Sequence, residues 1–122
     1  FNPAPFNEVV PAVLPLADVV IVNRREAEQL GDVQVPVLIT TLGARGCEVK
    51  VGSDVTTIEA PKVEVADPTG AGDAFVGAFS VAYVDTGDAV AAALIAVRAG
   101  AAAVRGVGAQ PSMPTWEQID NV

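Results

Sequence analysis

The chain has 122 residues, of which 51% are hydrophobic, and carries a formal net charge of −8 from 15 acidic and 7 basic residues. This length supplies at most one domain, and the acidic balance argues against a nucleic-acid-binding face, which needs clustered basic residues. The absence of histidine excludes the usual general base at neutral pH and the commonest zinc ligand. Any proton transfer must therefore use a carboxylate.

The single cysteine, Cys47, cannot form an internal disulfide, which favours a reducing, cytoplasmic setting. Val49 and Val51 alternate after it, so a small buried strand residue is favoured over a nucleophile. The Ala-rich stretch 89–104 is interrupted by Arg98 and is poor in Ile and Leu. We therefore expect no membrane span and no membrane partner.

The first half of the chain predicts short strands separated by turns. Residues 18–22 are apolar and mostly β-branched, as in a buried strand, and 24–30 predicts a short helix that stops at Gly31. A hairpin is predicted around Gly52. Strands are predicted at residues 18–22, 35–41, 48–51, 55–58 and 62–65.

The second half predicts helices. Residues 72–84 and 88–104 are apolar over helical lengths, and the second helix follows a stop at Gly87 with Asp88 as its N-cap. A last short helix is expected at 113–119. Strands followed by helices, with glycines at strand ends, predict an α/β layered fold with its ligand at the carboxyl ends of the strands.

Residues 67–73 read Asp-Pro-Thr-Gly-Ala-Gly-Asp and lead directly into the first long helix. The unpaired amides and the positive dipole end of a helix start suit an anion. Asp73 would lie beside that anion in the first turn, where a carboxylate can take a proton from an attacking hydroxyl. This arrangement favours phosphoryl transfer. A plain capped turn, with Gly-x-Gly as an ordinary loop feature, is the alternative.

Two further segments follow predicted strands. Asn23 and Glu26 have the spacing of a helix capping box, which is the structural interpretation of this pair. Residues 41–46 read Thr-Leu-Gly-Ala-Arg-Gly. Glycines at these positions let the backbone pass close to a ligand, although a hairpin-type turn explains them as well.

The run 67–79 closely resembles the C-terminal signature of the ribokinase-like (PfkB) family of carbohydrate and nucleoside kinases, and segments 23–26 and 41–46 resemble further motifs of that family in the same order. The resemblance implies an anion hole with Asp73 as catalytic base, ATP as cofactor, and Mg²⁺ placed by Glu26 through waters. The implied anion hole comprises Gly70, Ala71, Gly72 and Asp73. The implied nucleotide-binding residues are Asn23, Thr41, Gly43, Gly46 and Gly72.

The tail 103–112 resembles a family segment that, with the Asp-x-Thr element, often binds a monovalent cation such as K⁺, partly through backbone carbonyls. An ordinary helix end with a glycine stop is the alternative. The cation ligands implied by the resemblance are Asp67, Thr69, Ala103, Gly106, Gly108 and Ser112.

The resemblance covers nearly all of the chain, yet only the C-terminal part of a family member. It implies a Rossmann-like layered ribokinase fold, C-terminal part only, with residues 1–122 as its nucleotide-binding and catalytic portion and without the N-terminal substrate and lid part. The start at Phe1 also favours a fragment. One departure is that only residues 31–36 separate the first helix from the next strand, where the family usually has another helix.

The implied function is ATP-dependent phosphorylation of a sugar primary hydroxyl by the intact protein, with a homodimer compatible with the family. Residues 1–5 and 108–112 look most like the ribokinase members, so D-ribose is favoured. Adenosine, fructose phosphates and keto-deoxy sugar acids remain open as substrates. The alternative function is a non-catalytic nucleotide-binding fragment or an assembly module.

Overall fold

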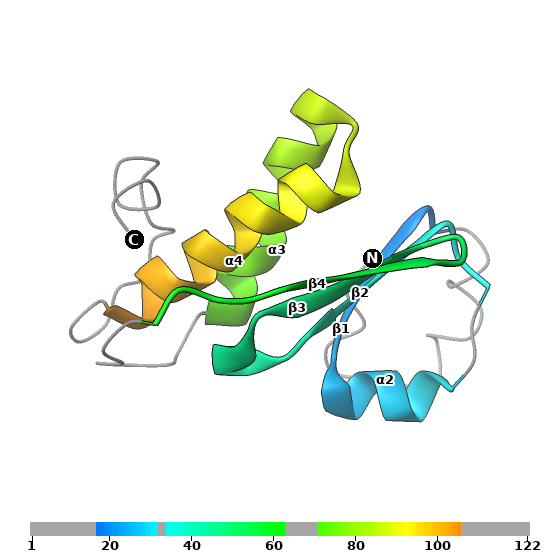
Figure 1. Ribbon diagram of the computed structural model, residues 1–122, viewed down its shortest axis with the longest axis horizontal. Coiled ribbons are helices and arrows are strands. Elements are labelled where there is room, and N and C mark those ends of the chain that lie inside the picture. The colour runs from blue at the N-terminus through cyan, green and yellow to red at the C-terminus, as the bar shows by residue number, and fades with distance from the viewer. Residues whose placement is uncertain (1–16, 32–33, 63–70, 106–122) are drawn as a thin grey trace. The chain divides into compact units, whose positions relative to one another are not determined.

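The computed structural model describes residues 17–31, 34–62 and 71–105 (Figure 1). The chain divides into two compact units after Thr57. The described elements, in chain order, are β1 (Val19–Asn23), α2 (Arg24–Leu30), β2 (Val37–Thr41), the 3₁₀ turn η2 (Gly43–Arg45), β3 (Cys47–Val51), β4 (Asp54–Ile58), α3 (Ala71–Thr86) and α4 (Ala89–Arg105).

The first unit is built on a mixed sheet with the strand order β1-β2-β3-β4. β1 and β2 are parallel, with Val19 opposite Val37 and Asn23 opposite Thr41, and α2 makes the crossover between them (Figure 1). β3 returns antiparallel to β2. Val20, Ile21 and Val22 of β1 are all buried, so both faces of this strand are covered, as its continuous apolar run predicts. β1 and β2 run in the same direction. The carboxyl ends of β1 and β2 therefore lie at the same sheet edge.

The connections agree with the local sequence signals. Gly31 ends α2 with a φ of 66°, and Gly52 turns the β3–β4 hairpin with a φ of 61°, conformations that favour glycine. Residues 31 and 34–36 form no helix, so the described part of the α2–β2 connection lacks the further helix usual in the family. Lys62 belongs to no strand, and the rest of the predicted strand 62–65 and the predicted helix 113–119 lie outside the described residues.

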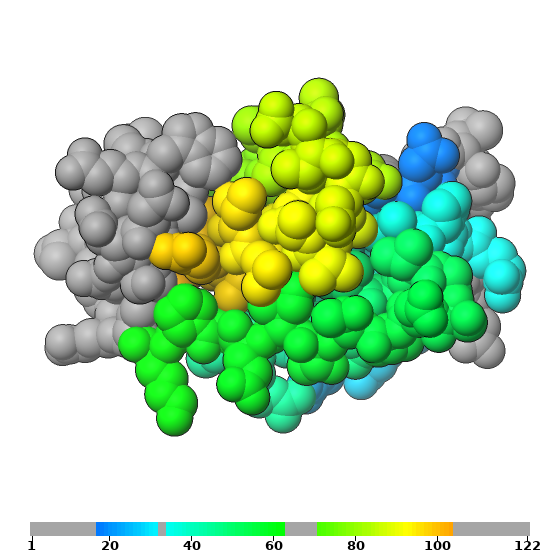
Figure 2. All heavy atoms as spheres, turned by 45° about the horizontal axis from the view of Figure 1, so that its top comes forward, coloured from blue at the N-terminus to red at the C-terminus, as the bar shows by residue number. Residues whose placement is uncertain are grey.

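The second unit contains α3 and α4, which pack along each other. Figure 2 shows the yellow and orange atoms of α4 directly against the yellow-green end of α3. Small side chains permit this approach: Ala78 of α3 and Ala99 of α4 are both buried, with Ile95 packed against them. A Cβ atom built on Gly100 would lie 3.5 Å from the carbonyl oxygen of Ala71. The start of α3 thus rests on α4. None of the described helices is long and apolar enough to cross a bilayer.

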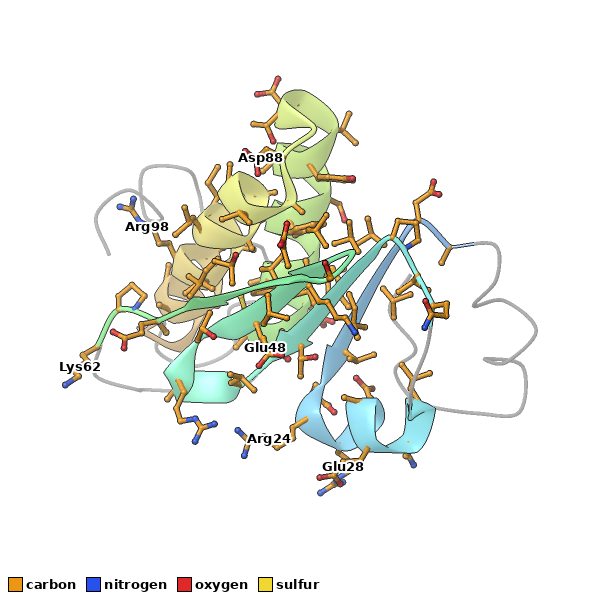
Figure 3. The ribbon with its side chains drawn as sticks, turned by 45° about the vertical axis from the view of Figure 1, so that its right-hand side comes forward. Arg24, Glu28, Glu48, Lys62, Asp88 and Arg98 are labelled. Atoms are coloured by element: carbon orange, nitrogen blue, oxygen red, sulfur yellow. The ribbon has the colours of Figure 1, made fainter. Side chains whose placement is uncertain are left out.

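Asp88 connects the two helices of this unit (Figure 3). Its Oδ1 accepts hydrogen bonds from the amides of Val90 at 3.0 Å and Ala91 at 3.1 Å. These are two of the orphan amides of the first turn of α4, so Asp88 is an N-cap, as the sequence predicts.

We expect Asp88→Ala to lower the free energy of unfolding by about 1 kcal/mol, because both capping bonds are lost. Urea unfolding of the whole protein that contains these residues measures the change. Asp85→Ala removes an exposed carboxylate from the last turn of α3 and is the matched control, expected to change stability little. Equal losses in the two variants would contradict a capping role for Asp88.

Candidate functional site

The β1–α2 corner is held by a reciprocal pair of hydrogen bonds. The amide of Glu26 donates to Oδ1 of Asn23 at 2.8 Å, and the amide of Asn23 donates to Oε1 of Glu26 at 2.9 Å. This is the capping box that the spacing predicts. The pairing explains why Glu26 is only 7% exposed, because its carboxylate binds the backbone rather than projecting into solvent. Asn23 is consequently fixed at the end of β1.

The neighbouring strand end presents Thr41. Its Oγ1 donates to the carbonyl oxygen of Val22 at 3.3 Å, which ties the end of β2 to the end of β1. The chain then turns through η2, where the amide of Leu42 donates to the carbonyl of Gly46 at 2.8 Å. Gly43 has a φ of 62° and open space around the position of a Cβ atom. Glycine is therefore required there by the backbone conformation, and it leaves the surface beside Thr41 free.

These two strand ends border an open depression of about 470 Å³. Clefts outside the carboxyl ends of parallel strands are the usual ligand sites of α/β sheets. Figure 3 shows Arg24 extending from the start of α2 on this side of the sheet. The lining residues are Asn23, Arg24, Arg25, Thr41, Leu42, Gly43 and Arg45.

Some of the site residues predicted from the sequence line the depression, and residues that were not predicted line it as well. Asn23, Thr41 and Gly43 line it together, whereas Gly46 is buried behind the turn. The three arginines of the depression are not predicted as site residues from the sequence. One signal was available: two of them occupy the first turn of a helix, where a cation is disfavoured.

The second unit contributes the first turn of α3. The helix begins at Ala71, and Asp73 lies in the first turn with its side chain exposed. The first amides of a helix have no partners within it, so this turn offers N–H donors beside a carboxylate. Gly72 is exposed as well, whereas Gly70 lies outside the described residues. The helix start and the place of Asp73 in its first turn agree with the sequence, and the anion hole and the base stay predictions.

The profile of pfkB family carbohydrate kinases matches residues 1–116. The chain belongs to this family. It is 31% identical to the ribokinase of Staphylococcus aureus strain COL over 99% of the chain and 46% of that protein. Its structure resembles the ribokinase of Thermotoga maritima with a TM-score of 0.88 at 27% identity, over 99% of this chain and 47% of that one. It also resembles a candidate ribokinase II from E. coli in complex with ATP and Mg²⁺, with a TM-score of 0.83 at 26% identity, over 93% of this chain and 41% of that one.

The chain thus spans less than half the length of these pfkB family relatives. The fold that the resemblance implied, an α/β ribokinase fold represented in part, is confirmed by these neighbours. The parallel register also explains how segments 23–26 and 41–46 can belong to one site, because the ends of β1 and β2 adjoin at one sheet edge.

Carboxylate residues do not cluster in the described part of this family member. No three Asp, Glu or Cys side chains of those residues lie close enough together to hold an ion. Of the two carboxylate oxygens of Glu26, Oε1 accepts a hydrogen bond from the amide of Asn23. Oε2 makes no hydrogen bond to the described residues, so it can accept one from a water. A hydrated Mg²⁺, which keeps several of its waters, fits such a single outer carboxylate.

Of the residues predicted to bind a monovalent cation, only Ala103 is described. It is one of the last residues of α4, so its carbonyl oxygen has no amide partner within the helix, and the dipole there favours a cation. The other predicted ligands, Asp67, Thr69, Gly106, Gly108 and Ser112, lie outside the described residues.

Cys47 plays no part in these sites. It is a free and fully buried cysteine of β3. Burial raises the pKa of its thiol to about 11, so the reactive thiolate is scarce at neutral pH. This agrees with the sequence interpretation of a small apolar strand residue.

Proposed function

We propose that the whole protein transfers the γ-phosphoryl group of ATP to a primary hydroxyl of a sugar, with D-ribose as the favoured acceptor. Membership of the pfkB family supports a carbohydrate kinase, and the ribokinase relatives support a pentose. The observation that carries the proposal is the exposed Asp73 carboxylate in the amide-rich first turn of α3. A carboxylate at such a position can accept a proton from a bound hydroxyl.

In this proposal the depression at the strand ends takes the nucleotide. Asn23 and Thr41 supply polar groups, and Gly43 leaves room for the ligand to approach the backbone. Glu26 would orient a water of the Mg²⁺ hydration shell through its Oε2. Bound Mg²⁺ would supply neutralisation of the charge on the phosphates. The complex of a related E. coli protein with ATP and Mg²⁺ supports these two ligands.

In the chemical step, Asp73 accepts the proton of the attacking hydroxyl as the O–P bond forms. The amides of Ala71, Gly72 and Asp73 donate to the transferring phosphoryl group and stabilise its negative charge, together with Gly70 at the preceding position. The side chain of Asp73 is exposed, so a bound hydroxyl can reach it. The non-catalytic alternatives, a nucleotide-binding fragment or an assembly module, would need no base at this position.

A coupled ADP-release assay of the whole protein with ATP and Mg²⁺ tests the function. D-ribose, 2-deoxy-D-ribose, D-fructose and adenosine are compared with a reaction that contains no acceptor. We expect ADP release to depend on the acceptor and to be fastest with D-ribose. Nucleotide binding with no acceptor-dependent ADP release would favour the non-catalytic alternative instead.

We also predict that the rate rises with K⁺ and much less with Na⁺. The support is the resemblance of segments 67–69 and 103–112 to a cation-binding pair and the place of Ala103 in the last turn of α4, where the helix dipole favours a cation. The two chloride salts are exchanged at constant ionic strength and constant Mg²⁺. Equal rates in both salts would refute the cation site.

A further inference from the structure

We propose that Arg24, Arg25 and Arg45 together bind the polyphosphate of the nucleotide and make affinity depend on the number of its phosphates. The inference rests on the proposed function, which gives the depression a nucleotide but assigns no role to these side chains. All three line the depression with Asn23 and Thr41.

The distribution of charge supports this role. The chain carries a formal net charge of −8 and five arginines, three of which gather at this one depression. They come from two segments, since Arg24 and Arg25 begin α2 and Arg45 ends the η2 turn. The parallel pairing of β1 with β2 brings these segments to one edge. A cationic surface on an otherwise acidic chain attracts anionic ligands to this one place.

The position of Arg24 and Arg25 is unfavourable for the free protein. They occupy the first turn of α2, where the partial positive charge of the unpaired amides disfavours a cation. No ion pair joins either of them, or Arg45, to an acidic residue in the described ranges, and the one acidic group of that turn, Glu26, is turned toward the amide of Asn23. Local rules of this kind are broken mainly at functional sites.

The guanidinium groups of the three arginines favour a phosphate ligand. A guanidinium group is always charged and donates two parallel hydrogen bonds to the oxygens of a phosphate. Arg24, Arg25 and Arg45 are all exposed, so their donors are free to rearrange onto a ligand. Two segments that present guanidinium groups across one depression suit a chain of two or three phosphates better than a single phosphate. Base and ribose gain nothing from these contacts.

The experiment measures the affinity of the whole protein for ATP, ADP, AMP and adenosine by calorimetry with Mg²⁺ at fixed ionic strength. The variants are Arg24→Gln, Arg25→Gln and Arg45→Gln. Lys50→Gln is the matched control, because it removes one exposed positive charge from β3 outside the depression. Each arginine variant is expected to weaken ATP and ADP binding by about tenfold, AMP binding less, and adenosine binding not at all. Lys50→Gln should bind all four ligands as the unmodified protein does.

Thermal unfolding without nucleotide supplies a second readout. Arg24→Gln and Arg25→Gln should melt at the same temperature as the unmodified protein or higher, because a disfavoured cation is removed. A merely structural role predicts a lower melting temperature and equal losses for ATP and adenosine, and that result would overturn the inference. Unchanged ATP affinity in all three variants, with acceptor-dependent ADP release intact, would overturn it and leave the proposed function standing. Absence of nucleotide binding in the unmodified protein would overturn both.

Discussion

Replacing Asp73 with Asn is expected to lower the kcat of sugar phosphorylation by about 10²–10⁴-fold, the range typical for loss of a general base. The amide of Asn keeps the size and hydrogen-bonding shape of the side chain but cannot accept the hydroxyl proton. Asp73 is exposed in the first turn of α3, and its carboxylate is proposed to accept a proton from the acceptor hydroxyl rather than to bind the nucleotide. The affinity for ATP should therefore change little.

Asp85→Asn is the matched control for this variant, because it removes an exposed carboxylate from the other end of the same helix. Steady-state rates with saturating ATP and D-ribose give kcat, and calorimetry gives the affinity for ATP. Loss of a negative charge at a helix start also costs about 0.3–1 kcal/mol of stability, so both rates are measured well below the melting temperature. A kcat for Asp73→Asn close to that of Asp85→Asn would end the assignment of Asp73 as base.

The second large effect concerns residues 1–122 expressed by themselves. We expect no measurable phosphorylation of D-ribose by this chain, although ATP still binds weakly. Positioning of the acceptor in line with the phosphoryl group supplies up to ~7–11 kcal/mol of barrier reduction in well-oriented systems. The chain spans less than half of its relatives, and the motifs found in it concern the nucleotide and the base rather than the acceptor.

This prediction needs a folded chain and a sensitive assay. Circular dichroism and a cooperative melt establish that the chain is folded, and calorimetry with ATP and Mg²⁺ measures binding. Release of ADP is then followed with and without D-ribose, with Asp73→Asn as the background. Ribose-dependent turnover above that background would show that the acceptor site lies within residues 1–122.

Local rules predicted most of the described elements. Gly31 and Gly87 stop helices with φ values of 66° and 67°, and Asn23 and Asp88 cap the helices that follow them. Each of these signals depends only on residues that are close together in the chain, so it can be recognised from a single sequence. The helix predicted to end at residue 84 continues to Thr86, because the positive φ of Gly87 is the actual stop and Asp85 and Thr86 tolerate a last helical turn.

The arginine cluster and the strand pairing could not be predicted in the same way. Arg25 and Arg45 are far apart in the chain, and only the register that sets Asn23 opposite Thr41 brings their segments together. That register depends on the sheet as a whole rather than on any short run of residues. Asn23 shows a second limit of sequence patterns. The same pattern predicts both the capping hydrogen bond that the structure shows and the nucleotide contact that we propose for this residue.

Phosphoryl transfer from ATP to a sugar hydroxyl with Asp73 as base is the function that we propose for this pfkB family member. Its most direct test is the transfer of label from [γ-³²P]ATP to D-ribose by the whole protein, with the sugar phosphate separated from inorganic phosphate. We predict labelled ribose phosphate with the unmodified protein and about 10²–10⁴-fold slower labelling with Asp73→Asn. Label found only in inorganic phosphate, or equal labelling of ribose by both proteins, would contradict the account.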